Sequence, residues 1–288
     1  MKLLLLFSEG PHDVAFIKLV LELGLDIRHI EHVRINDFPN PLSKIFMQIL
    51  KEHFVDDVAL EMVHRFSLPN YVFRKDDSYI MLFNTGGKDK FFVIKQLVSK
   101  IYLKLNEQDA SFDFTPSDII YLFTYDSDFK TAENEDKEIR NNLFPITEND
   151  AYPEDKEFFS ENPKVFLAGN EENLNFFFWP NNEDKGTLED ILLPIYKSNN
   201  QILLQNTENF VDDNFSDIFC IADKNEQEKV SITAAKHKAE ITMAGQGKKN
   251  KAGKPMSAIV MDNVLSDKQA FINDRNVKRF VTFLNNLI

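Results

Sequence analysis

Short apolar runs along the chain alternate with segments that have a helical hydrophobic period. The runs are rich in Leu, Ile, Phe and Tyr, and their length is typical of buried strands in a parallel sheet. They lie at residues 3–7, 79–83, 119–123 and 174–180. The segments with a helical period lie at about 12–23, 89–105, 132–142 and 187–193. Strands that alternate with helices predict an α/β fold with a mainly parallel sheet flanked by helices.

Two stretches interrupt this alternation. Residues 26–78 contain two predicted helices, at about 42–54 and 57–66, and Pro69-Asn70 separates them from the next strand. We interpret this stretch as a helical insertion. A second stretch, at 145–163, is rich in Pro and acidic residues and predicts a loop.

The C-terminal third of the chain is mainly helical in pattern. Its candidate helices lie at about 230–243 and 274–287. The sequence therefore predicts an α/β core over residues 1–195, and a helical extension over residues 196–288 that packs on the core.

The composition describes a globular protein with a sizeable core. Of the 288 residues 43% are hydrophobic, and the 27 phenylalanines are expected to pack mainly in that core. The single cysteine, Cys220, excludes an internal disulfide and a Cys-rich zinc site. No apolar run approaches the roughly 20 residues of a membrane span, and the apolar start breaks too early for a signal peptide. We therefore expect a cytoplasmic protein without a membrane role.

The acidic balance limits how the chain would bind nucleic acid. A net charge of −13 argues against nonspecific coating, because phosphate neutralisation supplies most of that affinity. A nuclease is not excluded, since acids at a metal site can coexist with a local basic surface. Such a surface is predicted from the lysines that fall within nineteen residues, namely Lys236, Lys238, Lys248, Lys249, Lys251 and Lys254.

Acidic residues follow two of the apolar strands. Glu9 comes directly after the first, and Asp126 and Asp128 come at the end of the strand that begins at residue 119. Open α/β sheets bind ligands at the carboxyl ends of their strands, so these carboxylates would converge if the strands are neighbours. Oxygen ligands without His or Cys favour Mg²⁺ or Mn²⁺.

Three further acids are candidate ligands with an alternative role. Asp13 completes a Glu-Gly-x-x-Asp turn with Glu9, but an acid at a helix start is also favoured by the helix dipole. Glu189 and Asp190 follow the fourth apolar run, and they are equally candidates for capping a helix whose predicted N-cap is Thr187.

A glycine turn is a candidate phosphate site. Gly86 and Gly87 follow the second apolar run and would let backbone amides approach a phosphate, while Lys88 would reach the same place. The alternative is a simple tight turn. The pattern of a nucleotide-binding P-loop is absent, so an ATPase is not expected.

Taken in order, these motifs resemble the Toprim domain of topoisomerases, bacterial primases and OLD-family nucleases. The resemblance rests on the Glu after the first strand, the Gly-Gly turn after the second and Asp-x-Asp after the third. Small uncharacterised Toprim-like proteins are more similar still, in the stretches 179–182, 186–192, 238–239 and 253–259. Two positions depart from the family pattern. Phe129 follows Asp-x-Asp, and Asn181 stands where the family has an acid, which would remove one metal ligand.

The resemblance implies metal-assisted hydrolysis of phosphodiesters. Asp126 and Asp128 would hold Mg²⁺ or Mn²⁺, and Glu9 would share that ion or act as general acid or base. Glu189 with Asp190 would bind a second ion, and Lys238 would face the charge that develops on the phosphate. A small endonuclease acting on DNA or RNA is the leading interpretation, and a role in defence or nucleic-acid processing follows from family analogy alone.

Two other interpretations stay open at this point. One is a noncatalytic Toprim-fold protein that binds nucleic acid or a partner, and the other is a phosphohydrolase for small nucleotides. The sequence also leaves open an activating protein partner and a homodimer. No tyrosine-bearing second domain, zinc segment or helicase-binding module is visible, so neither a topoisomerase nor a primase is expected.

Overall fold

The computed structural model describes residues 1–55, 68–88, 90–107, 109–143, 146, 149, 155–157, 173–248 and 250–288. Five strands form one sheet in the order β2-β3-β1-β4-β5. They are β1 (Lys2–Ser8), β2 (Tyr71–Lys75), β3 (Ser78–Asn84), β4 (Ile119–Asp126) and β5 (Leu174–Trp179). Strands β3, β1, β4 and β5 are parallel, and β2 joins β3 antiparallel. The predicted α/β class with a mainly parallel sheet is confirmed.

Nine α-helices are described around this sheet. They are α1 (Pro11–Leu19), α2 (Leu42–Val55), α4 (Phe91–Asn106), α5 (Ala132–Leu143), α7 (Glu189–Phe215), α8 (Glu226–Gln246), α9 (Met256–Met261), α10 (Lys268–Asn273) and α11 (Arg275–Leu287). A π-helical turn, Val20–Gly24, extends α1 to the predicted glycine stop. The helix predicted at 57–66, and nearly all of the loop predicted at 145–163, lie outside the described residues.

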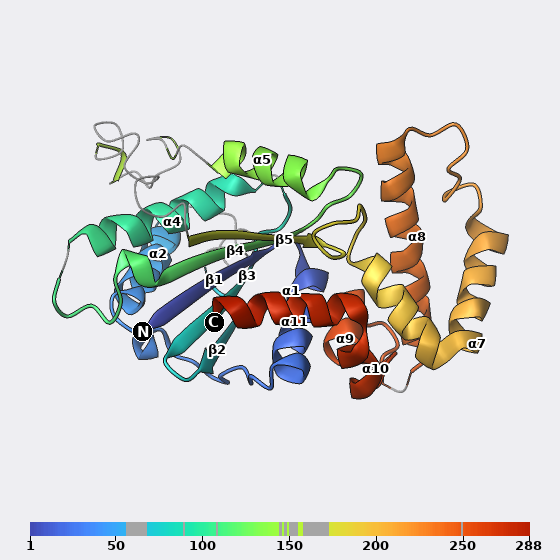
Figure 1. Cartoon of the computed structure of the whole chain (residues 1–288), viewed down its shortest axis with the longest axis horizontal. Coiled ribbons are helices and arrows are strands. Elements are labelled where there is room, and N and C mark those ends of the chain that lie inside the picture. Colours follow the sequence, from blue (N-terminus) through green and yellow to red (C-terminus); the bar gives the residue numbers. More distant parts are fainter. Residues whose placement is uncertain are drawn as a thin grey trace.

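Helices cover both faces of the sheet (Figure 1). Alternate residues of β1 point to opposite faces, as the pleat of a strand requires. Leu4 and Leu6 pack with α1 and the C-terminal helices, whereas Leu3, Leu5 and Phe7 pack with α2, α4 and α5. Burial on both faces is the physical reason why the strands read as continuous apolar runs.

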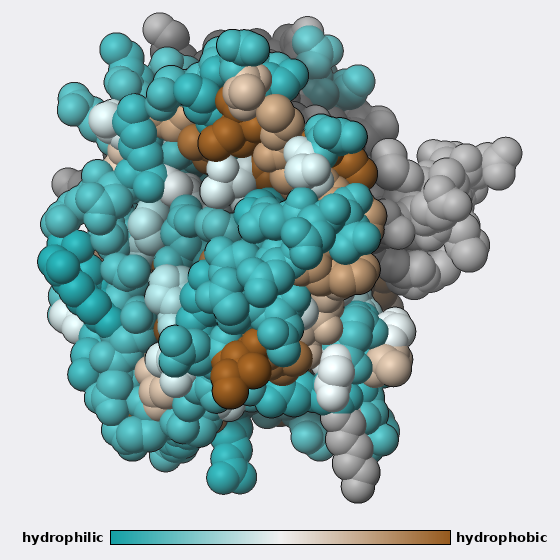
Figure 2. Space-filling view, turned by 90° about the vertical axis from the view of Figure 1, so that its right-hand side faces the viewer, coloured by the Kyte–Doolittle hydropathy of each residue, from teal (hydrophilic) through white to brown (hydrophobic). Residues whose placement is uncertain are grey.

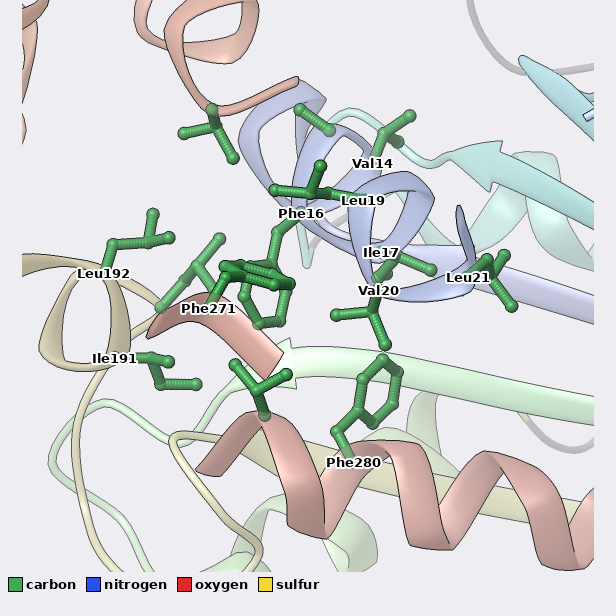
Figure 3. Close-up of a cluster of buried hydrophobic side chains, with 14 of the residues drawn as sticks. Val14, Phe16, Ile17, Leu19, Val20, Leu21, Ile191, Leu192, Phe271 and Phe280 are labelled. Carbon is green, nitrogen blue, oxygen red and sulfur yellow. The ribbon is translucent and has the colours of Figure 1, made fainter. Parts of the chain in front are cut away.

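The C-terminal helices share the core of the first half of the chain. Side chains of α1, the start of α7, α10 and α11 point into one cluster, seen at Phe16, Ile191, Phe271 and Phe280 (Figure 3). The C-terminal helices therefore pack on the same face of the sheet as α1. The predicted boundary at residue 195 falls inside α7, which bends at Asn200 and continues to Phe215.

The stretch 26–78 is not wholly helical. It contains α2 as predicted, but it also contributes β2, an edge strand that the sequence analysis did not predict. Within the described part of the chain, no helix is long and apolar enough to cross a membrane.

Candidate functional site

The carboxyl ends of β1 and β4 and the start of α7 bring four acids together. Ser8 is level with Thr124 in the sheet, so Glu9 emerges beside the end of β4, which is Asp126. The pKa of Asp126 is raised well above its usual value by burial and then by the negative charges of Asp13, Glu9 and Glu189. The geometry agrees with this repulsion, because Asp126 Oδ1 accepts from the N–H of Leu188, next to Glu189, at 2.8 Å, and Asp13 Oδ2 accepts from the N–H of Gly10, next to Glu9, at 3.0 Å.

Glu9 and Glu189 each present a buried carboxylate oxygen that has no hydrogen-bond partner in the described structure, Oε2 in both cases. Glu189 is only 1% exposed, and burial is the main cause that raises the pKa of both groups. The ammonium of Lys238 lies 3.6 Å from Glu189 Oε1, which offsets part of this cost. Buried, unpaired carboxylate oxygens are costly, so these two atoms point to a cation from outside the chain.

Asp13 is held by two hydrogen bonds within the protein. Its Oδ1 accepts from the indole Nε1 of Trp179 at 2.9 Å, and its Oδ2 accepts from the backbone N–H of Gly10 at 3.0 Å. The pKa of Asp13 is raised to about 7 by burial, Glu9 and Glu189, against the opposing effect of the Trp179 hydrogen bond. Asp13 therefore takes the helix-start role that was the alternative to metal binding, while still adding charge to the site.

Lys88 lies against the Asp-x-Asp motif. Its Nζ donates to Asp128 Oδ2 at 2.6 Å and to the carbonyl oxygen of Asp126. Burial lowers the pKa of Lys88, but Asp128 and Glu9 outweigh that effect and the net pKa is raised. Lys88 was predicted to contact phosphate, and in this structure it neutralises acids that were predicted to hold a metal.

Lys238 reaches the same acids from α8. Burial lowers its pKa, but the charges of Glu189, Asp126, Asp13 and Glu9 raise it on balance, and its ammonium lies closest to Glu189, at 3.6 Å from Oε1. The structure thus brings Lys238 to the acids where the resemblance implies it. His12 is a neighbour that the sequence analysis missed. The pKa of His12 is lowered to about 4 by burial and then by the charge of Lys238. His12 directly precedes Asp13 in the sequence, and this position could have identified it as a site residue.

Asp190 serves mainly as a helix cap. Its Oδ2 accepts from the backbone N–H of Thr187 at 2.8 Å, and its Oδ1 lies 3.6 Å from His237 Nδ1. The helix is assigned from Glu189, with Leu188 before it in helical φ/ψ, and the bond from the Thr187 N–H to the acid three residues later is the one that the predicted capping box requires. Of the two adjacent acids only Glu189 faces the Asp126 site, because successive residues of a helix point about 100° apart.

The loop after β5 is tied to the end of β4 through Ser127, which is fully buried. Its hydroxyl accepts from the backbone N–H of Gly186 at 3.0 Å and lies 3.0 Å from the carbonyl of Asp184. Asn181 organises the same loop, since its Oδ1 accepts from the N–H groups of Glu183 and Asp184. Asn181 therefore supports the loop, and the sequence analysis identified neither this role nor that of Ser127.

The glycine turn lies at the end of β3, beside β1. Gly86 and Gly87 have φ values of +79° and +132°, which only glycine adopts readily. Thr85 Oγ1 donates to the carbonyl of Ser8 at 3.0 Å and fixes the turn next to Glu9. The turn is thus placed as predicted, and phosphate binding by Gly86 and Gly87 stays a prediction.

The acids do not form a ready metal site. Among the residues that the structure describes, no three His, Cys, Asp or Glu side chains are grouped so that they could hold one ion. The carboxylates of Asp13, Asp126 and Asp128 each accept a hydrogen bond within the protein, that of Asp126 from the N–H of Leu188 at 2.8 Å. The chemistry of the donor set still fits a divalent cation, because the unpartnered oxygens of Glu9 and Glu189 lie among carboxylates whose repulsion a cation would relieve.

The predicted basic surface near α8 is largely paired. Lys236 pairs with Asp212 at 2.5 Å, Lys251 pairs with Asp262, and Lys248 donates to Asn200 Oδ1 at 2.6 Å. Lys249 lies outside the described residues. The face at the α7–α8 end is mostly hydrophilic, with separate hydrophobic areas (Figure 2). Since internal acids take up much of this charge, the stretch is a weaker phosphate surface than its lysine content suggests.

Comparison with known proteins gives a family without an assigned function. A family model described as "Protein of unknown function (DUF3226)" matches residues 3–288. Among solved structures, the chain is similar to the crystal structure of hypothetical protein PH0156 from Pyrococcus horikoshii OT3, with 14% sequence identity and a TM-score of 0.46. The similarity covers 100% of this chain and 95% of that chain. No curated protein matches the chain.

Proposed function

The chain belongs to the DUF3226 family of proteins of unknown function, and from its site we propose that it is a divalent-metal-dependent phosphodiester hydrolase that cleaves nucleic acid. One observation carries the proposal. Buried carboxylate oxygens of Glu9 and Glu189 lack a partner at the carboxyl ends of parallel strands, inside a group of acids that repel one another. Ligand sites of open α/β sheets lie at this edge.

The order of motifs supports a Toprim-type site. The Glu, the Gly-Gly turn and Asp-x-Asp follow β1, β3 and β4, and these three strands are adjacent and parallel. The three motifs therefore meet at one edge of the sheet, which the resemblance requires. The chain has the acids for such a site even though Asn181 replaces one family acid.

In the proposed reaction, Asp126 and Asp128 would hold one Mg²⁺ or Mn²⁺, and Glu189 would contribute to a second. Bound ions of this kind activate water and offset the charge of the reacting phosphate. Glu9 would share the first ion or accept a proton from the attacking water. Lys238 would stabilise the negative charge that develops on the phosphate oxygens.

The direct test is cleavage of supercoiled plasmid, single-stranded DNA and RNA by the purified chain with Mg²⁺ or Mn²⁺. We expect metal-dependent cutting that falls by at least about 100-fold in Glu9→Gln and Asp126→Asn, because each removes a group that acts on the reacting atoms. Glu133→Gln, an exposed acid on α5, is the matched control and should cut normally.

Other outcomes would contradict the proposal in identifiable ways. Hydrolysis of mononucleotides in preference to all polymers would indicate the small-substrate phosphohydrolase. Binding of polymers without cutting under either metal, and unchanged in the two acid variants, would indicate the noncatalytic binding protein.

A further inference from the structure

A groove runs between the loop that follows β5 and the exposed face of α11. Its cavity volume is about 680 Å³, within the range of ligand sites in proteins. Helix α11 begins near the carboxyl ends of the strands and runs back along the sheet (Figure 1). The groove therefore starts at the carboxyl end of β5, the strand next to β4, and leads away from it along α11.

The groove is basic in an otherwise acidic protein. Three cations line it, Arg275, Lys278 and Arg279, against one carboxylate, that of Glu183. Glu183 pairs with Arg279. Within the described part of the chain neither Arg275 nor Lys278 pairs with an acid, and both are exposed. Two free cations in one groove of a chain with net charge −13 indicate an anionic ligand.

The same groove contains an aromatic side chain, Phe283, that packs against a buried ring. Phe283 is partly buried, and its ring centroid lies 5.2 Å from that of Phe177, which is 2% exposed. A supported aromatic ring beside a row of cations is the combination with which proteins bind single-stranded nucleic acid, where bases stack and phosphates pair with cations.

Hydrogen bonds connect the groove to the acid site. The amide Nδ2 of Asn181 lies 3.3 Å from Asn276 Oδ1 on α11 and donates to Asp184 Oδ2 at 2.8 Å. The carbonyl of Asp184 lies 3.0 Å from Ser127 Oγ, and Ser127 separates the two acids of Asp-x-Asp. Because these part-buried hydrogen bonds connect both walls of the groove to Ser127, a strand bound in the groove would have a defined position relative to Asp126.

A peptide strand is a poorer fit than nucleic acid at this place. The side chain of Asn182 occupies the edge of β5, where its Oδ1 accepts from Phe178 N–H at 2.7 Å and its Nδ2 lies 3.4 Å from the carbonyl of Phe176. These contacts block the backbone groups with which an added β-strand would pair. The groove thus presents cations and an aromatic ring, while the backbone groups of Phe176 and Phe178 on the edge of β5 are already bonded to Asn182.

We propose that the groove between the β5 loop and α11 binds the backbone of a single-stranded nucleic acid and leads it to the carboxylates. This inference rests on the proposed function and specifies its substrate. Arg275 and Lys278 contact phosphates, and Phe283 stacks on a base.

The test measures binding separately from cleavage. Fluorescence anisotropy follows labelled single-stranded DNA and RNA, and a duplex of the same sequence, binding to the full chain in EDTA at about 0.1 M salt. We expect Arg275→Gln with Lys278→Gln to weaken single-strand binding about 25-fold, because each lost phosphate contact costs about fivefold at this salt. Phe283→Leu should weaken it about fivefold or more. The matched control, Lys2→Gln with Lys229→Gln, removes the same charge from exposed lysines elsewhere and should leave binding unchanged.

Three results would overturn the inference: equal weakening in the control, no binding of either single strand, or tighter binding of the duplex. Circular dichroism establishes that each variant is folded. The two proposals fail separately. If single-strand binding depends on the groove residues but nothing is cut with Mg²⁺ or Mn²⁺, the nuclease proposal is refuted and the groove proposal stands. If the groove variants cut as well as the wild type, the groove proposal is refuted and the nuclease proposal stands.

Discussion

Asp13→Asn should reverse its effect on stability between acid and neutral pH. In the wild type the pKa of Asp13 is raised from its usual value of 3.8 to about 7, because the group is buried next to Glu9 and Glu189. A tenfold change in proton affinity corresponds to about 1.4 kcal/mol, so ionising Asp13 in the folded protein costs about 4 kcal/mol. The folded state holds this proton more tightly than the unfolded chain does. The stability that protonated Asp13 provides is therefore lost as pH rises from about 4 to about 7, and the contribution of Asp13 does not change further above that.

Asparagine has no charge to bury, but it accepts fewer hydrogen bonds. Asp13 accepts from both Trp179 and Gly10, and an Asn side chain would keep one of these bonds, which costs about 1 kcal/mol. At pH 4 Asp13→Asn should be less stable than the wild type by about 1 kcal/mol. At pH 8 it should be more stable by about 3 kcal/mol.

Urea unfolding in EDTA at both pH values measures this crossover. Trp179 is the single tryptophan, is buried and donates to Asp13, so its fluorescence reports unfolding of the site itself. Far-ultraviolet circular dichroism provides an independent signal, since the substitution alters the surroundings of the indole. The exposed acid variant Glu133→Gln should match the wild type at both pH values. A variant Asp13→Asn that is no more stable than the wild type at pH 8 would refute the view that the acids repel one another in the folded chain.

Three further predictions concern the site and its supporting helices. Mg²⁺ or Mn²⁺ at 100 times its dissociation constant should stabilise the wild type by about 2.7 kcal/mol in thermal unfolding, and Glu189→Gln should reduce this gain; an equal gain in the variant would remove Glu189 from the metal site. Lys238→Met should lower cleavage about 100- to 1,000-fold while leaving the metal-induced thermal shift in place. The control Lys229→Met should leave both cleavage and the thermal shift unchanged. Gly245→Ala should lower the free energy of unfolding by up to about 2 kcal/mol in urea, because the new Cβ would overlap the side chain of Ile259 and overpacking outweighs the helix propensity of alanine. A more stable Gly245→Ala variant would show that α8 and α9 can separate to accept the methyl group.

The strand predictions succeeded where burial on both faces makes a strand apolar throughout. The run at 174–180 contains β5 and extends one residue beyond it, and the other three predicted strands lie within β1, β3 and β4. Strand β2 was missed because it is an edge strand, in which only Val72 and Phe73 are buried, so no long apolar run marks it. Most of α7 was missed for a related reason, since beyond its bend at Asn200 many of its residues are exposed.

At the site, the sequence determined which acids stand at the ends of strands, because an apolar strand ends where polar residues begin. On that basis Glu9, Asp126 and the Gly-Gly turn could each be placed at the end of a strand, whereas their meeting at one place depends on the strand order β3-β1-β4 of the sheet. Only the tertiary structure decided what each side chain contacts. The facing direction of Glu189 and Asp190 depends on the first turn of α7, and the approach of Lys238 depends on how α8 packs against that helix. The basic groove likewise has one wall from the β5 loop and the other from α11, about a hundred residues apart, and no local pattern encodes their meeting.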